Sequence, residues 1–142
     1  MSDPRRNTLY STDLLALAVE LGAYPYKLDA TLQGEARSRT CGSVIALSAD
    51  AAFDNLGLRV SACAVGQAAA AIFARHVADR NLQDLNTVLD QLDAWLGQGD
   101  ARPEWPDIEL LAPARDFPGR HGAIMLPWKA ALDALSKERD EG

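Results

Sequence analysis

The chain has 142 residues, 48% of them hydrophobic and 24% charged, which is typical of one soluble globular domain with a buried core. Its formal net charge of −6 disfavours nucleic-acid binding, and no apolar run approaches the roughly 18 residues of a membrane-spanning helix. The first residues lack the apolar core of a signal peptide, so we expect a cytoplasmic protein with reduced thiols. We therefore expect no nucleic-acid partner and no membrane partner.

The N-terminal part is predicted to form a short disordered segment followed by a helix. Residues 1–9 are polar and are expected to be disordered. A helix should begin near Thr12, with Ser11 or Thr12 as its N-cap, because leucines then recur at helical spacing. Gly22 is expected to end it.

Three strands are predicted next. A polar, alternating stretch over 30–38 indicates an edge strand, with Gly34 as a candidate bulge. The apolar run 44–48 and the segment 56–62 indicate two further strands. Short connections between consecutive strands favour an antiparallel meander.

The second half of the chain is predicted to be helical. An alanine-rich helix is expected over 65–77 and a leucine-striped helix over 82–96, followed by a short helix over 107–111. The last helix should run over about 123–136, before a disordered acidic tail at 138–142. The sequence thus predicts an α+β fold. In this predicted fold, helices pack on a three-stranded antiparallel sheet, with one helix N-terminal and the others C-terminal to the strands.

A single domain is expected over residues 10–137, because no internal repeat or linker interrupts them. Tryptophans 95 and 128 fall at positions typical of a core. Trp105 lies in a proline-rich loop and is a candidate partner-docking residue. His76 lies 13 residues after Cys63, so helical rise places it about 18 Å away, too far for a shared site.

The only two cysteines of the chain occupy turns that can present a thiol. Cys41 precedes the apolar run that starts at Val44, and Cys63 lies where the pattern changes from strand to helix. The positive end of a helix dipole stabilises a thiolate, which is the form that binds metals and attacks sulfur. The pair therefore indicates metal or sulfur chemistry, and a disulfide is the less favoured alternative in a reducing compartment.

Three short segments carry a family resemblance. Thr40-Cys41-Gly42-Ser43-Val44 resembles a Pro-x-Cys-Gly-Asp-x motif, and the segment 61–68 (SACAVGQA) resembles a Gly-Cys-Ala-x-Ser-Gln-Ala-Ser motif. The segment 123–130 (AIMLPWKA) resembles the Cys-Ala-x-Leu-x-Trp-x-Ala run that begins at a third cysteine. These motifs are typical of the U-type iron–sulfur cluster assembly scaffolds, namely IscU, SufU and the N-terminal part of NifU. The resemblance covers roughly residues 10–136.

Two positions depart from the family pattern. Ser43 stands where the family has an aspartate, and Ala123 stands where it has the third cysteine. Two of the usual three thiol ligands remain, and the carboxylate is absent. We interpret the chain as a degenerate member of this family.

The resemblance implies a function and a set of partners. Such scaffolds accept sulfur from a cysteine desulfurase, assemble a [2Fe–2S] cluster on their cysteines and pass it to apo iron–sulfur acceptor proteins. Cys41 and Cys63 would bind the cluster or iron, Cys63 is a candidate sulfur acceptor, and zinc can fill the same kind of site. A cluster shared by two chains would make the protein a homodimer.

A tetrahedral site needs four ligands, so two cysteines alone are insufficient. His121 lies two residues before Ala123 and is the candidate third ligand, since an imidazole reaches farther than a cysteine side chain. The alternative is a solvated turn histidine. Ser43 is disfavoured as the fourth ligand, because a serine in a turn more often makes a turn hydrogen bond. The fourth ligand is left open between Asp54, Asp116, water and a partner's thiol.

Positive charge flanks these segments, at arginines 37, 39, 115 and 120. It would suit an anionic cluster or persulfide, although scattered solvated arginines are an equal interpretation.

Three functions remain open on the sequence. The first is a cluster scaffold or carrier, which is not an enzyme. The second is a non-catalytic homologue, a zinc-binding or regulatory partner of cysteine desulfurase. The third is a sulfurtransferase-like thiol enzyme with Cys63 as the persulfide carrier.

Overall fold

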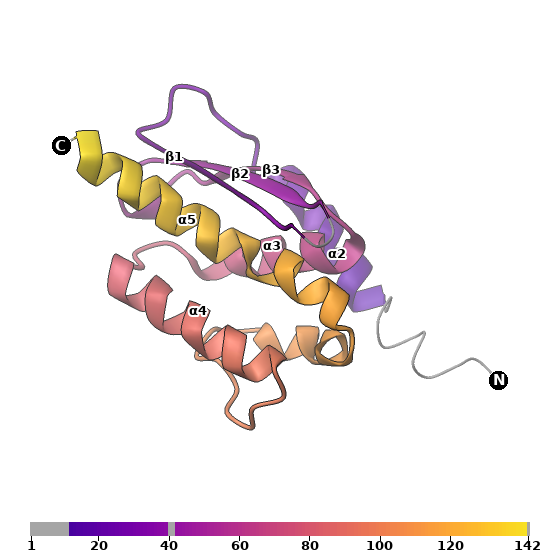
Figure 1. Cartoon of the computed structure of the whole chain (residues 1–142). Helices are drawn as coiled ribbons and strands as arrows, with labels where there is room; N and C mark the ends of the chain where they lie inside the picture. The colour runs from indigo at the N-terminus through magenta and orange to yellow at the C-terminus, as the bar shows by residue number, and fades with distance from the viewer. Residues whose placement is uncertain (1–11, 40–41, 142) are drawn as a thin grey trace.

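The protein is described here by a computed structural model, which covers residues 12–39 and 42–141, with side chains up to residue 137. The expected disorder of residues 1–9 and the expected N-cap Ser11 lie outside these residues. Figure 1 shows the arrangement. The elements in chain order are α2 (Thr12–Glu20), η1 (Leu21–Ala23), β1 (Leu32–Arg37), β2 (Val44–Ala49), η2 (Ala51–Phe53), β3 (Gly57–Ser61), α3 (Ala64–His76), α4 (Leu82–Leu96), η3 (Ile108–Asp116), η4 (Pro118–Arg120) and α5 (His121–Glu141).

The three strands form one antiparallel sheet in the order β1-β2-β3, which confirms the predicted meander and the α+β class. Leu32 of β1 pairs with Ala49 of β2, and Val44 of β2 pairs with Ser61 of β3. In β2, Ile45 and Leu47 are buried, as a period-two pattern requires of a strand with one face on the core. The sheet therefore contributes one apolar face to a common core.

Helices α3 and α5 lie against the sheet, and α4 lies on the side of α5 that faces away from it (Figure 1). Residues 68–71 of α3 are four consecutive alanines with no exposed surface. Small side chains let this helix pack closely between its neighbours. Within the residues described, no helix has both the length and the apolar character needed to cross a bilayer.

Gly34 lets α5 approach β1 closely. A Cβ at this position would lie 2.3 Å from the Ala130 carbonyl oxygen and 2.5 Å from the Ala134 nitrogen. Next to it, Asp133 Oδ2 accepts a hydrogen bond from the Glu35 backbone N–H at 2.9 Å, so α5 also covers the strand edge. The predicted bulge at Gly34 is wrong, because the β1–β2 pairing is continuous there. The glycine serves helix packing instead.

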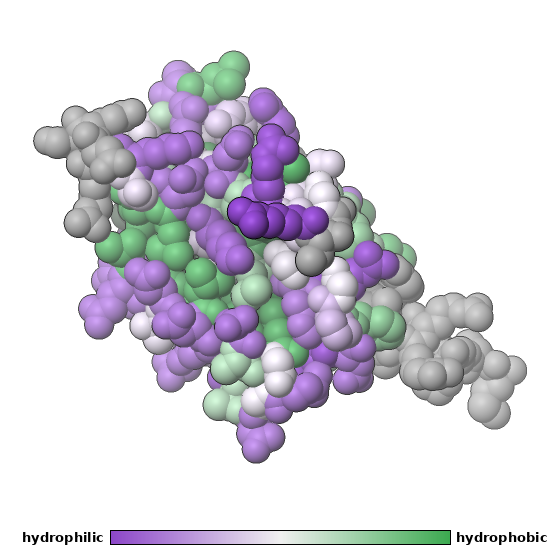
Figure 2. Space-filling view, in the orientation of Figure 1, coloured by the Kyte–Doolittle hydropathy of each residue, from purple (hydrophilic) through white to green (hydrophobic). Residues whose placement is uncertain are grey.

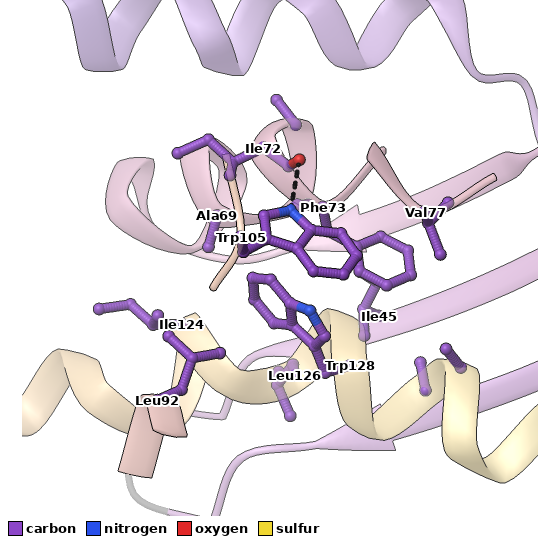
Figure 3. Close-up of a cluster of buried hydrophobic side chains, with 14 of the residues drawn as sticks. Ile45, Ala69, Ile72, Phe73, Val77, Leu92, Trp105, Ile124, Leu126 and Trp128 are labelled. Atoms are coloured by element: carbon purple, nitrogen blue, oxygen red, sulfur yellow. Dashed lines mark hydrogen bonds between the residues drawn. The ribbon is translucent and has the colours of Figure 1, made fainter. Parts of the chain in front are cut away.

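Three aromatic rings form the centre of the core (Figure 3). Trp105 stacks on Phe73 with ring centroids 5.9 Å apart, and Trp128 meets both rings edge-on at 5.5 and 5.3 Å. Trp105 is only 3% exposed and its Nε1–H donates to the Ile72 carbonyl at 3.1 Å. A partner-docking role for Trp105 is therefore wrong, because its loop folds inward to fill the space between α3 and α5. The predicted core positions of Trp95 and Trp128 are confirmed.

The helix boundaries follow the sequence signals where caps are strong. Helix α4 spans the predicted residues, and Asn81 and Asp84 form a capping box at its start. The predicted short helix 107–111 is instead the 3₁₀ segment η3, which extends to Asp116 and contains Pro113. Helix α5 is longer than the predicted 123–136, since it begins at His121 and its backbone stays helical through Glu141. The expected acidic tail thus continues this helix, except for residue 142, which lies outside the described residues.

An ionic cluster joins the ends of three segments at the opposite end of α3 from Cys63. Arg75 binds both Glu20 and Asp107, and His76 Nε2 lies 2.9 Å from Asp107 Oδ2. The hydrogen bond from His76 lowers the pKa of Asp107 below its usual range, and the hydrogen bond from Arg75 lowers that of Glu20. His76 ends α3, at the opposite end of the helix from Cys63, which agrees with the prediction that the two residues do not share a site.

The close α5–β1 contact predicts the effect of filling Gly34. Gly34→Ala should lower the free energy of unfolding by roughly 3 kcal/mol, because the new methyl group would meet backbone atoms that cannot move independently. Urea denaturation measures the loss. Gly22→Ala is the matched control, since no heavy atom lies within 4 Å of a Cβ there, and should change stability by less than about 0.5 kcal/mol. Equal effects of the two substitutions would contradict this packing.

The ionic cluster predicts a pH dependence. Because the folded-state pKa of Asp107 is lowered, its interactions stabilise the fold above the unfolded-chain pKa of about 4 and are lost as pH falls through the folded-state value. Asp107→Asn should cost roughly 1 kcal/mol at pH 7 and much less at pH 3, as urea midpoints can show. Asparagine suits the left-handed backbone at this position, where φ is 69°. Asp90→Asn on the exposed face of α4 should show no such difference between the two pH values.

Candidate functional site

The candidate site lies at one end of the sheet, where a strand, two helices and a hairpin turn meet. The β1–β2 turn is closed by a hydrogen bond from Ser38 N–H to the Ser43 carbonyl at 2.9 Å. Val44, which follows this turn, pairs with Ser61, two residues before Cys63. The β1–β2 turn and the junction that contains Cys63 thus lie at the same end of the sheet. Cys41 itself lies outside the described residues, and its part in the site stays a prediction.

Cys63 is the N-cap residue of α3, with an extended backbone at φ −67° and ψ 170°. Its side chain is half-buried, and within the described part of the chain it is a free thiol. The first backbone N–H groups of α3 face this end of the helix, and their partial positive charge favours an anion there. The structure thus places Cys63 where the sequence predicted it, at the start of a helix.

Gln67 fixes the turn that presents Cys63. Its backbone N–H donates to the Cys63 carbonyl at 2.9 Å, and its side-chain Nε2 donates to the Ala62 carbonyl at 2.9 Å. Both carbonyls next to the thiol are therefore held by one residue. The motif at 61–68 contains Gln67 without predicting a role for it, although a polar side chain four residues after an N-cap is the available signal.

The first turn of α5 packs against the first turn of α3. A Cβ built on Gly66 would lie 3.2 Å from the Ala123 Cβ and 2.8 Å from the Ala62 Cβ. Ala123, at the position of the family's third cysteine, is only 1% exposed. The position of the missing thiol is thus beside the Cys63 turn, and a buried methyl group occupies it.

His121 is the first residue of α5, and its ring is half-buried. Its Nε2 lies 3.2 Å from the Ala114 carbonyl oxygen and 3.1 Å from the Arg115 carbonyl oxygen. The ring is therefore held against η3 and does not hang free in solvent. The structure brings His121 to the same helix turn as Ala123, while metal binding by its ring stays a prediction.

The other candidate ligands are distributed unevenly. Asp54 follows the far end of β2, so the structure does not bring it to the cysteine turn. Asp116 ends η3, five residues before His121, and is exposed. Ser43 is buried in the β1–β2 turn, as its predicted turn role requires. Over residues 12–39 and 42–137, no three Cys, His, Asp or Glu side chains are grouped closely enough to bind a metal ion.

The flanking arginines are not equivalent. Arg115 is a structural residue, because its Nε donates to the Trp95 carbonyl at 2.8 Å and its Nη2 to the Gly99 carbonyl at 2.6 Å. Arg37 is exposed near Glu35. Among the described contacts, the side chains of Arg39 and Arg120 have no hydrogen bond or ion pair, so these two are the cations left to act on an anion.

A separate hollow lies away from Cys63. Figure 2 shows apolar surface between α4 and α5. A cavity of about 420 Å³ is lined there by Leu82 of α4 and Leu135 of α5, together with residues of the η2 and α3–α4 segments. Its described lining contains no cysteine or histidine, so the thiol chemistry belongs to the other end of the sheet.

Comparison with known proteins completes this picture. No family model matches the chain. It is 22% identical over 118 residues to the iron–sulfur cluster assembly scaffold protein IscU of Thermotoga maritima, which aligns 77% of this chain and 80% of that protein. The N-terminal NifU-like protein of Brucella abortus has a similar crystal structure (TM-score 0.84, 22% identity, 97% of this chain and 99% of that chain covered).

A further solved structure has the same fold. It is a SufU protein of Fervidobacterium islandicum, named as an assembly scaffold for the SUF system, and it superposes with a TM-score of 0.75 at 16% identity. The superposition covers 91% of this chain and 98% of that one. As its motifs predicted, the chain thus has the fold of the U-type iron–sulfur cluster scaffolds and is similar to them in sequence over most of its length.

Proposed function

We propose that the protein is an iron–sulfur cluster assembly scaffold or carrier that binds iron and sulfur on Cys41 and Cys63 and transfers them to acceptor proteins. The observation that carries this proposal is the half-buried free thiol of Cys63 at the start of α3, beside the α5 turn that bears His121. The named functions of the similar IscU and SufU proteins support the same role. In this role the protein carries its cargo and is not an enzyme.

Cys63 suits the acceptance of sulfur. In its thiolate form it would attack the outer sulfur of a persulfide on a cysteine desulfurase. A new S–S bond forms on Cys63, the donor's S–S bond breaks, and the donor cysteine leaves as a thiolate. The helix N-terminus would favour the negative charge of the resulting persulfide, and Arg39 and Arg120, which have no side-chain hydrogen bond or ion pair among the described contacts, are the flanking cations that would add to this effect.

The donor set fits a soft metal but is incomplete in a single chain. Tetrahedral iron or zinc takes four ligands, of which cysteine and histidine are the usual ones. Cys63 and His121 are the two described donors, and Cys41 is the proposed third. A water molecule or a thiol from a partner completes the count, and two chains sharing one [2Fe–2S] cluster would do so as a homodimer.

The buried methyl group of Ala123 favours a second candidate function. With an alanine in place of the third thiol and a serine in place of the carboxylate, the protein would bind zinc, or no metal, and act as a regulatory partner of the desulfurase without building clusters. One measurement distinguishes this candidate from the first: its binding to the desulfurase would survive the loss of both cysteines.

Anaerobic reconstitution with iron, sulfide and a reductant tests the scaffold. The wild-type protein should acquire sulfur-to-iron charge-transfer absorption in the visible region, which Cys41→Ala and Cys63→Ala should abolish and His121→Ala should shift or weaken. Visible spectra and iron and sulfide content per chain are the measurements. His76→Ala is the matched control, because it removes the other imidazole at the far end of α3. A folded wild-type protein without a chromophore would contradict the scaffold and leave the zinc-binding or regulatory module.

Restoring the third thiol tests what Ala123 contributes. In Ala123→Cys, the new thiol would lie beside the Cys63 turn, so a reconstituted cluster should resist a chelator several-fold longer than in the wild type. The decay of the visible absorption measures this lifetime. Ala131→Cys is the control, because it adds a thiol at another fully buried alanine of α5, away from the site. Equal lifetimes for the two variants would show that position 123 is not part of the ligand set.

A further inference from the structure

The orientation of His121 depends on a hydrogen-bond network that begins in the turn after α4. We infer that this network holds the proton of the neutral His121 ring on Nε2, so that Nδ1 is its metal-binding atom, and that Arg115 is the positioning residue of this arrangement. The metal-binding half of this inference rests on the proposed function, whereas the tautomer does not.

The contacts of Nε2 determine the tautomer. The Ala114 and Arg115 carbonyl oxygens lie 3.2 and 3.1 Å from this nitrogen, and a carbonyl oxygen only accepts hydrogen bonds. Nε2 must therefore carry a hydrogen. In a neutral imidazole the other nitrogen then has the free lone pair, which is the electron pair that a metal takes.

Arg115 fixes the two carbonyls in place. Its guanidinium donates to the Trp95 and Gly99 carbonyls and lies over the Trp95 ring at 5.0 Å, which ties η3 to the end of α4. Gln98 Nε2 donates to the same Arg115 carbonyl at 2.8 Å. The acceptor that faces His121 is thus held from a second side, and the ring cannot turn without losing this partner.

This arrangement matches the way metal-binding histidines are held in general. They usually donate the hydrogen of the other ring nitrogen to a carbonyl or carboxylate, which fixes the tautomer, and loss of such a partner weakens metal binding about 10- to 100-fold. Nδ1 is also the ring nitrogen nearer the backbone. His121 begins α5, whose first turn packs on the Cys63 turn through Ala123 and Gly66, so Nδ1 would supply a donor from this turn.

Long-range ¹H–¹⁵N NMR of the full ¹⁵N-labelled chain distinguishes the tautomers. At pH 8, without metal, His121 should show a protonated Nε2 and an unprotonated Nδ1, with the signals assigned by His121→Ala. Zn²⁺ alone is then added, and the Nδ1 resonance of His121 should shift while that of His76 stays unchanged. Arg115→Met should lower the population of the Nε2-protonated tautomer in favour of the other one, and it should weaken Zn²⁺ binding about ten-fold or more.

Arg102→Met is the matched control. It removes the same charge from an exposed loop, and no described hydrogen bond joins its side chain to the network, so it should leave the tautomer unchanged. The wild-type spectra depend only on the His121→Ala assignment and keep the inference testable if Arg115→Met does not fold.

Each outcome has a defined meaning. A protonated Nδ1 in the metal-free wild type would overturn the inference without affecting the proposed function. Zn²⁺ binding that leaves Nδ1 unshifted would overturn the ligand role of His121 and leave a cysteine site standing. Absence of any Zn²⁺ binding would overturn the ligand role of His121 together with the metal-binding function. A shift of the His121 Nδ1 resonance, with that of His76 unchanged, would support the ligand role and the metal-binding function.

Discussion

The contact of α5 with the sheet and with α3 is the constraint on which the candidate site depends. It exists because Gly34 and Gly66 have no side chain where α5 approaches, since a Cβ at Gly34 would lie 2.3 Å from the Ala130 carbonyl oxygen and one at Gly66 would lie 3.2 Å from the Ala123 Cβ. The alanines of α3 and α5 extend the same close packing along the core. Because one rigid helix makes both contacts, its first turn is held beside the Cys63 turn, and the residues of that turn inherit a fixed position.

The sequence predicted the parts of this arrangement that local patterns encode. The three strands, the capped helix α4 and the position of Cys63 at a helix start follow from periodicity and caps, whose signals lie within a few residues. Trp105 and Gly34 were misinterpreted because their roles depend on partners distant in the chain. Ile72 binds the indole N–H of Trp105 from α3, and Ala130 lies against Gly34 from α5. No local pattern carries such contacts.

In the candidate site, too, local patterns predicted some features, and contacts between distant residues determine the others. A motif singled out Cys63, and His121 was a candidate because it lies two residues before Ala123. The structure places Cys63 at the N-cap of α3 and His121 at the first residue of α5. Gln67 had a local signal, since it lies four residues after Cys63. The hydrogen bonds of Arg115 to the Trp95 and Gly99 carbonyls had none, because they join residues 20 and 16 positions apart. Arg115 illustrates the difference well. As a charge in a sequence it suggested an anion site, whereas in the fold its donors are used by backbone oxygens.

An incomplete ligand set need not conflict with a carrier function. A scaffold must release its cargo, and a site with three thiolates binds iron more firmly than one in which a neutral imidazole replaces a thiolate, because the imidazole brings no negative charge. Replacement of the buried thiol by Ala123 also leaves a methyl group against Gly66, which keeps the α3–α5 contact packed without cargo. The fold would therefore not depend on the metal, unlike that of small zinc-folded domains. In the proposed carrier role, loading and release would change only what is bound at one end of the sheet, while the core of Phe73, Trp105 and Trp128 holds the rest of the structure in place.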